Sequence, residues 1–361
     1  MSTPSVLQAV AACIDTFVER RREEIAAHGP DARGLVEAAA ASLQGGKGLR
    51  ARFCRAGWSA VARRSTPAAA EADALWETCA SLEVFQASAL VHDDVIDNSD
   101  TRRGRPSMHR VFETAHADAG WSGNGAAFGR SSAILLGDLL LAWSDDLLET
   151  GLTGHPHADA VRSEYARMRR DVTLGQYLDV AEEAAWSVND DSTHAERALR
   201  VASLKSARYS VEQPLLIGAA LAGAAPEQRR SLQGFGHPVG MAFQLRDDVL
   251  GVFGDEDATG KPAGDDLREG KRTLLIAWTR EALAAPGRRL VDELLGDPAL
   301  TPDQIASLQA AIVESGALRR VEELIVRYAA DADTALRDAP LDAHALDELR
   351  ELARAATSRI A

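Results

Sequence analysis

The stretch LEVFQASALVHDDVIDNSDTRRG, residues 82–104, decides the fold of this chain. Its first ten residues are mostly apolar and contain no glycine or proline, which predicts a buried helix that continues into the acidic residues. Asp93 and Asp97 are four residues apart, so on that helix they project from the same face. Like charges at this spacing repel each other, and we therefore expect a cation to lie between them.

The chemistry of this stretch points to a metal ion and a phosphate group. Mg²⁺ prefers oxygen ligands and binds through one or two carboxylates together with substrate phosphates. Arg102 and Arg103 follow the acidic residues and offer planar guanidinium groups that match phosphate oxygens. A second acidic pair, Asp247 and Asp248, follows later in the chain. One such pair is usually a solvated helix face, whereas both together predict the facing walls of a cavity that binds Mg²⁺ and a diphosphate.

Lysine is rare in this chain, and its positions are informative. The chain has 40 lysines and arginines together, and its four lysines are Lys47, Lys205, Lys261 and Lys271. All except Lys205 are next to glycines, which let a backbone approach a ligand closely. A compact ammonium fits where a broad guanidinium does not, so we expect these lysines in a substrate site. Chance survival at flexible turns explains any one glycine-flanked lysine but not all three.

Composition and periodicity predict an all-α protein, a single large helical bundle. The 361 residues are rich in Ala, Leu and Arg, and apolar residues recur at helical spacing, as at Leu318, Val321 and Ile325. We find no linker, and therefore expect one domain over residues 1–361, with residues 1–30 as a helical extension packed on it. Helix breaks are expected at residues 28–30, 45–48, 115–130, 151–157, 187–194, 224–226 and 251–270.

Charge and targeting signals exclude several classes of protein. The formal net charge of −14 argues against a nucleic-acid partner. The start of the chain lacks the basic and apolar regions of a signal peptide, and Asp138 interrupts the apolar run at residues 131–143. Cys13, Cys54 and Cys79 lack metal-ligand spacing and are expected to be core thiols. We expect a cytoplasmic protein without an integral membrane segment.

Several ordered motifs resemble the trans-isoprenyl diphosphate synthases, the polyprenyl synthetase family, from about residue 30 to the C-terminal region. Residues 93–97 are similar to the short form of the family's first aspartate-rich motif. The other similar positions are Gly46-Lys47 with Arg50, Gln86, Gly175-Gln176 with Asp179, Lys205-Ser206, Phe243-Gln244 with Asp247, Gly260-Lys261-Pro262 with Asp266, and Gly270-Lys271. The sequence as a whole looks like the actinobacterial geranylgeranyl diphosphate synthases.

Three positions depart from the family's pattern. Gly251 stands where the family usually has a third aspartate in its second acidic motif. Gly48 and Ala51 replace a basic residue and a proline of the early loop. In the family the first aspartate of the second motif does most of the metal binding there, which in this chain is Asp247.

The resemblance implies an isoprenoid synthase-type fold around a central active-site cavity, in a homodimer. The implied reaction joins isopentenyl diphosphate head to tail to an allylic diphosphate, and depends on three Mg²⁺ ions held by Asp93, Asp97 and Asp247. Metal ions and cations neutralise the leaving diphosphate, so that the allylic carbon–oxygen bond can ionise. The implied catalytic set is Asp93, Asp97, Lys205, Gln244, Asp247 and Lys261. The implied substrate-binding set is Lys47, Arg50, Gln86, Arg102, Arg103, Ser206 and Lys271.

Within the binding set, the resemblance divides the residues between two substrates. Arg102, with Lys205 and Lys261, would hold the allylic diphosphate. The residues that would bind isopentenyl diphosphate are Lys47, Arg50, Gln86 and Arg103. Gln244 and Ser206 would stabilise the allylic cation.

Product length should depend on Phe85, Ser88 and Ala89, which precede the first acidic motif. Ser88 and Ala89 are small and about one turn from Asp93, where a bulky aromatic residue would stop chain growth. Phe85 is eight residues before Asp93, about 12 Å from it along the helix axis, and could form the floor of the cavity that holds the growing chain. We predict a C20 product, then C25 or longer, with C15 less favoured, and we expect Ser88→Phe to shorten it.

Two other functions remain open from the sequence. One is a non-catalytic partner subunit of a heteromeric prenyl synthase, which Gly251 favours and the intact first motif disfavours. The other is a terpene cyclase on the same fold. The early loop and Gln86, which serve a second diphosphate in the family, argue against a cyclase.

Overall fold

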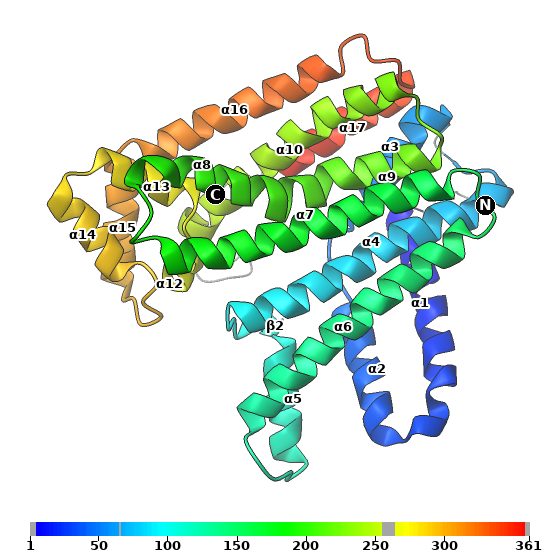
Figure 1. The fold of residues 1–361 in the computed structure, drawn as a ribbon, viewed down its shortest axis with the longest axis horizontal. Helices are drawn as coiled ribbons and strands as arrows, with labels where there is room; N and C mark the ends of the chain where they lie inside the picture. The colour runs from blue at the N-terminus through cyan, green and yellow to red at the C-terminus, as the bar shows by residue number, and fades with distance from the viewer. Residues whose placement is uncertain (1–4, 65, 255–263, 358–361) are drawn as a thin grey trace. The chain divides into compact units, whose positions relative to one another are not determined.

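The computed structural model describes residues 5–64, 66–254 and 264–357, and these residues are almost entirely helical (Figure 1). This confirms the prediction of an all-α protein. The chain divides into two compact units, one of Met1–Ser59 with Arg64–Ala158 and one of Ala60–Arg63 with Asp159–Ala361. The expectation of one domain over the whole chain stays a prediction.

Two long antiparallel helices, α4 (Ala69–Ile96) and α6 (Gly125–Leu152), form the centre of the first unit and lie side by side in Figure 1. Small polar side chains link them. The Ser144 hydroxyl donates a hydrogen bond to the Ser81 carbonyl at 2.8 Å. About two turns farther along, the Ser88 hydroxyl donates to the Gly137 carbonyl, also at 2.8 Å. Small residues at this seam let the two backbones approach closely.

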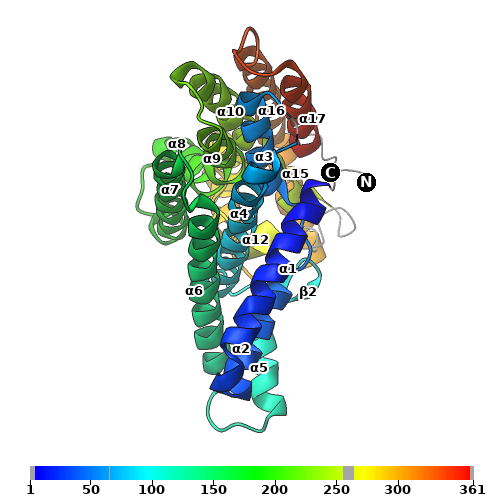
Figure 2. The ribbon, with the colours of Figure 1, turned by 90° about the vertical axis from the view of Figure 1, so that its right-hand side faces the viewer.

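The remaining elements of the first unit surround this pair. They are α1 (Val6–Glu24), η1 (Ala26–His28), α2 (Pro30–Ser42), α3 (Leu49–Ala62, whose last residues belong to the second unit), β1 (Thr101–Arg102), β2 (Arg105–Pro106) and α5 (Met108–Asp118). A capping box starts α1, because Ser5 and Gln8 each accept a hydrogen bond from the other's backbone N–H. Helix α1 packs against α4 and lies beside α2 (Figure 2).

The second unit is organised around α10 (Pro226–Phe253), which packs against α16 (Ala317–Ala335) and the π-helical segment η3 (Ala202–Glu212). Leu245 and Val249 of α10 are fully buried in its apolar core. The other elements are α7 (Ala158–Ala185), η2 (Asp191–Thr193), α8 (His194–Val201), α9 (Gln213–Leu221), α12 (Asp265–Glu269), α13 (Leu274–Ala282), α14 (Ala285–Leu294), α15 (Pro302–Glu314) and α17 (Ala343–Thr357).

The helix ends agree with most of the predicted breaks. Breaks occur as expected at residues 28–30, 45–48, 151–157, 187–194 and 224–226. Helices α5 and α6 extend into the expected break at residues 115–130 and leave only residues 119–124 between them. Helix α10 continues through Gly251 to Phe253, so this glycine is helical rather than part of a loop.

One described helix, α6, is long and apolar enough to cross a membrane by length and composition alone. The sequence analysis did not predict such a helix, because Asp138 interrupts the apolar run at residues 131–143. Core helices of soluble proteins share this length and composition, and α6 packs along both α4 and α5.

Candidate active site

The first acidic motif lies at the C-terminal end of α4, where Arg102 pairs with Asp93 and Asp94. Its guanidinium is 3.2 Å from the Asp93 carboxylate, and its Nε donates a hydrogen bond to Asp94 at 2.7 Å. Asp94 is buried, whereas the Asp93 side chain remains 20% exposed. Asp97 caps the helix, and its backbone N–H donates to the Asp93 carbonyl at 2.8 Å. Asp93 and Asp97 therefore stand one turn apart at a solvent-accessible helix end.

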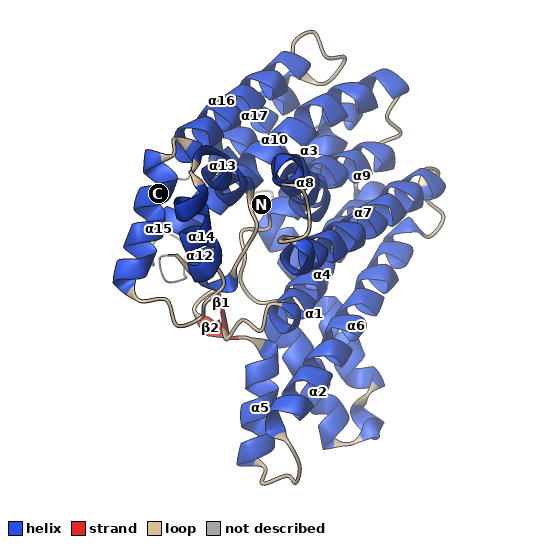
Figure 3. Ribbon diagram, turned by 60° about the vertical axis from the view of Figure 1, so that its left-hand side comes forward, coloured by secondary structure: helices blue, strands red, loops and turns tan. Residues whose placement is uncertain are grey.

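The hairpin of β1 and β2 holds the two arginines apart (red in Figure 3). Its central residues Arg103 and Gly104 have φ angles of 54° and 70°, as a type I′ turn requires. The Arg103 guanidinium reaches the early loop, where it lies 3.1 Å from the point at which a Cβ on Gly46 would stand. Burial lowers the pKa of Arg103. The adjacent arginines thus serve different places: Arg102 contacts the acidic helix end and Arg103 the glycine loop beside Lys47.

The departures in the early loop have structural causes. Gly48 is buried with a φ of 55°, and a Cβ there would lie 2.2 Å from the Leu7 side chain of α1. The positive φ suits glycine, and the Leu7 side chain would have to move to make room for a side chain at position 48. The backbone N–H of Ala51 donates to Glu83 at 2.9 Å, a hydrogen bond that proline could not make. Arg50 lies beside it on α3, and Lys47 is exposed.

The candidate chain-length residues do not share one face of α4. Ser88 is buried against α6, about 140° around the helix from Asp93 at 3.6 residues per turn. Ala89 is half-buried and lies one turn before Asp93 on nearly the same face. Gln86 is also half-buried on that face. Phe85 is buried, and its position around the helix lies between those of Asp93 and Ser88. The pocket role of these residues stays a prediction, and the geometry favours Ala89 over Ser88 for it.

The second acidic motif, on α10, has one outward and one inward carboxylate. Asp247 is exposed, whereas Asp248 is buried and accepts a hydrogen bond from the Gln244 amide at 2.7 Å. Burial raises the pKa of Asp248 to about 8, and the nearby carboxylates of Asp266 and Asp247 act in the same direction. Asp247 is therefore the residue of this pair that is exposed for binding a metal ion.

Lys205 belongs to the π-helical segment η3, and its ammonium pairs with Asp179 at 2.6 Å. Two glycines let the segment pack closely. A Cβ on Gly175 would lie 2.3 Å from the backbone nitrogen of Lys205, and one on Gly240 would lie 2.3 Å from the backbone carbonyl oxygen of Ala207 in η3. Ser206 follows Lys205 on the same segment. π-Helical turns are frequent at functional sites, and this one fixes the backbone that presents Lys205.

Lys271 follows α12 and pairs with Asp266 at 3.1 Å and with Glu269 at 2.7 Å. Lys261 lies outside the described residues. Sequence reasoning assigned no role to Asp266, although its place in the resemblance could have indicated one. Over the described ranges, no group of three or more His, Cys, Asp or Glu side chains is arranged to hold a metal ion.

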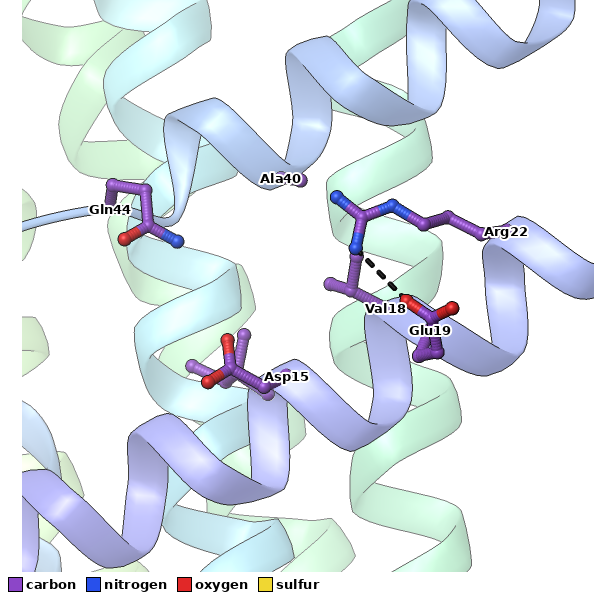
Figure 4. A pocket seen from close by; sticks show the side chains of 7 residues that line it. Asp15, Val18, Glu19, Arg22, Ala40 and Gln44 are labelled. Carbon is purple, nitrogen blue, oxygen red and sulfur yellow. Dashed lines mark hydrogen bonds and ion pairs between the residues drawn. The ribbon is translucent and has the colours of Figure 1, made fainter.

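A cavity of about 170 Å³ lies between α1 and α2, and it contains no predicted site residue (Figure 4). Its lining residues are Ile14, Asp15, Val18, Glu19, Arg22, Ala40 and Gln44. Arg22 spans it and donates hydrogen bonds to Glu19 and Glu37.

Comparisons with known proteins identify the family of the chain. Residues 33–312 match the family model for polyprenyl synthetase. The chain is 34% identical to a geranylfarnesyl diphosphate synthase of Aeropyrum pernix over 67% of this chain and 69% of that protein. It is also 34% identical to a (2E,6E)-farnesyl diphosphate synthase of Mycobacterium tuberculosis, over 66% of this chain and 61% of that protein.

A solved structure covers the whole chain. The geranylgeranyl pyrophosphate synthase from Corynebacterium glutamicum, complexed with isoprenyl diphosphate and magnesium, superposes with a TM-score of 0.92 at 34% identity, over 100% of both chains. The fold and these relatives define an all-α trans-prenyltransferase. The chain belongs to the polyprenyl synthetase family. The resemblance stated from the sequence is thereby confirmed.

Proposed function

We propose that this protein condenses isopentenyl diphosphate head to tail with an allylic diphosphate in a Mg²⁺-dependent reaction. The observation that carries the proposal is the divergence of the two adjacent arginines. Arg102 contacts the acidic end of α4, whereas Arg103 lies against the glycine loop that bears Lys47. Two separate cationic places suit two diphosphate substrates, which a condensation needs. A terpene cyclase, which ionises one diphosphate, does not need the second place.

The residues fit Mg²⁺ as the metal. Asp93, Asp97 and Asp247 offer only hard carboxylate oxygens, which suit Mg²⁺ rather than softer metals. Bound Mg²⁺ would neutralise the leaving diphosphate and favour ionisation of the allylic carbon–oxygen bond. We propose three ions, by resemblance to the family. The solved relative from Corynebacterium glutamicum, complexed with magnesium, supports the choice of metal.

The cationic side chains hold the two diphosphates in this scheme. Arg102, Lys205 and Lys271 bind the allylic diphosphate, with Lys261 as the candidate outside the described residues. Isopentenyl diphosphate is held by Lys47, Arg50, Gln86 and Arg103. Holding the double bond against the allylic carbon makes the bond-forming step effectively unimolecular.

Two polar residues would stabilise the allylic cation. The Gln244 amide nitrogen donates to Asp248, so its carbonyl oxygen is the atom suited to face positive charge. The Ser206 hydroxyl, on the π-helical segment, is the second candidate.

We propose a C20 product, geranylgeranyl diphosphate, or a somewhat longer one. The small Ala89 on the Asp93 face of α4 leaves room for a growing chain, which supports this length. Relatives named for farnesyl, geranylgeranyl and geranylfarnesyl products span the range from C15 to C25.

We propose that the protein acts as a cytoplasmic homodimer. Exposed apolar residues support a subunit contact: Ile134 and Leu135 on α6 are 46% and 60% exposed. In the second unit, Leu174, Tyr177 and Val180 of α7 are likewise exposed. Size-exclusion chromatography with light scattering measures the state directly, and a monomer would contradict the proposal.

The test of the activity uses purified protein with Mg²⁺, isopentenyl diphosphate and each of the C5, C10 and C15 allylic diphosphates. We expect a product of C20 or longer by chromatography, and none after chelation of the metal. A cyclised hydrocarbon from the allylic diphosphate alone would indicate a terpene cyclase. If folded protein gives no product with any primer, the chain is instead a partner subunit of a heteromeric synthase.

A further inference from the structure

The π-helical segment η3 is long for its kind. It spans 11 residues, and the backbone N–H of Gln213 still donates to the Arg208 carbonyl five residues back. π-Helices are rare and mostly last a single turn, so a segment of this length needs its neighbours to hold it. Backbone contact does part of this, because a Cβ built on Gly236 of α10 would lie 2.9 Å from the Cα of Glu212 at the end of η3. Two other glycines, on α7 and α10, contact the segment in the same way.

A chain of charged and polar side chains also crosses η3 from α7 to α10. The Arg208 guanidinium donates a hydrogen bond from Nη1 to the Asp171 carboxylate of α7 at 3.0 Å. Its Nε lies 3.9 Å from the carboxylate of Glu212. On α10, the His237 Nδ1 atom lies 3.0 Å from Glu212, and the Gln233 amide donates to it at 3.2 Å. Asp171 and Glu212 are only 4% and 2% exposed, so these contacts supply hydrogen bonds that water does not.

Two ion pairs attach η3 to α7, and they differ in burial. Lys205 pairs with Asp179, and both side chains are 21% exposed. Arg208 pairs with Asp171, whose side chain is 5% exposed. The two aspartates are eight residues apart, about 12 Å along the axis of α7, whereas the two cations are three residues apart. Two attachments separated in this way fix both the position and the rotation of η3 on α7.

We propose that Arg208 is a positioning residue, which through its pair with Asp171 holds η3 in the winding that presents Lys205 to the allylic diphosphate. This inference rests on the proposed function, in which Lys205 binds that diphosphate. When Lys205 turns to the diphosphate, its pair with Asp179 weakens, and one of the two attachments of η3 is lost. The pair of Arg208 with Asp171 is the attachment that remains, because its carboxylate is buried.

The winding of η3 explains how Arg208 would act on a ligand that it does not touch. Without its pair to Asp171, η3 would be free to rewind toward the commoner ladder of α-helical hydrogen bonds. Such a change rotates the side chains of the segment relative to α7. Lys205 would then reach the diphosphate less often, and binding would weaken. Because Arg208 acts through Lys205, its effect should disappear when Lys205 is absent.

A double-mutant cycle tests the inference. The proteins compared with the wild type are Arg208→Gln, Lys205→Ala and the double variant. Arg200→Gln is the matched control, because Arg200 of α8 forms an exposed pair with Glu196. Calorimetry measures the affinity for inorganic pyrophosphate in the presence of Mg²⁺, and urea midpoints show whether each variant is folded. Steady-state kinetics give a separate KM for each of the two substrates.

We expect Arg208→Gln to weaken pyrophosphate binding about 5- to 20-fold, and the control to stay within about twofold. In the Lys205→Ala protein, the same change at Arg208 should add less than about twofold. KM for the allylic substrate should rise in Arg208→Gln, while KM for isopentenyl diphosphate stays within about twofold. If Arg208→Gln does not fold, Arg208→Lys replaces it. This variant keeps the charge but not the planar fork, and we expect a loss of at least about threefold.

Wild-type pyrophosphate affinity in a folded Arg208 variant would overturn the inference. Losses that multiply in the double variant would do so too, since Arg208 would then act independently of Lys205. A wild type that binds no pyrophosphate with Mg²⁺ would also refute it. If the cycle shows the expected coupling but the wild type makes no prenyl product, the proposed function is refuted, and the positioning of Lys205 by Arg208 stands.

Discussion

Phenylalanine at position 88 and phenylalanine at position 89 should have different consequences, because the two residues face different sides of α4. Ser88 is 3% exposed, and its hydroxyl donates to the Gly137 carbonyl of α6 at 2.8 Å. Losing this hydrogen bond costs about 1 kcal/mol. Forcing an aromatic ring between two closely packed helices costs about 1–3 kcal/mol more. We expect Ser88→Phe to lower the free energy of unfolding by about 2–4 kcal/mol.

Ala89→Phe should instead change the product. Ala89 is half-buried and lies on nearly the same face as Asp93, about 6 Å along the helix axis. A ring there would enter the path of the growing chain without disturbing α6. We expect the main product to shorten by at least one isoprene unit, with a change in unfolding free energy of about 0.5 kcal/mol or less.

Urea unfolding and product chromatography separate the two effects. Both variants are incubated with Mg²⁺, isopentenyl diphosphate and the C5 allylic primer, and Ala89→Ser serves as the control of similar size. The reasoning is refuted if Ser88→Phe keeps the wild-type stability while its product shortens. An unchanged product from folded Ala89→Phe would refute the steric explanation of chain length altogether.

The remaining predictions concern the acidic motif, the early loop, one thiol and the ligands. Asp93→Asn should reduce turnover at least about 10²-fold, as steady-state rates would show. It should change the free energy of unfolding by only about 1 kcal/mol in urea unfolding, because the pair of Asp93 with Arg102 is partly exposed. Gly46→Ala should displace Arg103 and raise KM for isopentenyl diphosphate more than KM for the allylic substrate. Burial raises the pKa of Cys13 to about 12. Because the unfolded chain loses this proton from about pH 8.5, the free energy of unfolding should fall as pH rises from about 8.5 toward 12. In Cys13→Ala, urea midpoints should fall less over this range. Calorimetry should show pyrophosphate binding at least about 5-fold more tightly with Mg²⁺ than without it.

Local sequence patterns predicted the structural features that depend on residues close together in the chain. The apolar run before Asp93 predicted α4, and the two arginines that follow it predicted a cation near the carboxylates, where Arg102 pairs with Asp93. The metal ion expected between Asp93 and Asp97 stays a prediction. The direction of Ser88 was not predictable in the same way. Helical periodicity gives the angle between Ser88 and Asp93, but which side α6 covers depends on packing between distant segments.

The departures from the family pattern show the same limit more sharply. Read in sequence, Gly48 and Gly251 are missing side chains. In the structure Leu7 takes the space beside the first and Asp266 the space beside the second. No local rule connects a glycine to a residue many positions away that fills its place. A missing functional group in a motif is therefore weak grounds for inferring lost activity until the neighbours in space are known.

Under the proposed function, the charge pairs within each unit give a reason for metal and diphosphate to bind together. Arg102 contacts Asp93 in the first unit, while Lys205 contacts Asp179 and Lys271 contacts Asp266 in the second. A diphosphate alone would take the cations and leave carboxylates without a counter-charge, and Mg²⁺ alone would do the reverse. Under the proposed function, only the two ligands together would replace the partners that binding removes within each unit. Their binding free energies would then be coupled, and by linkage each ligand would strengthen the other by the same factor.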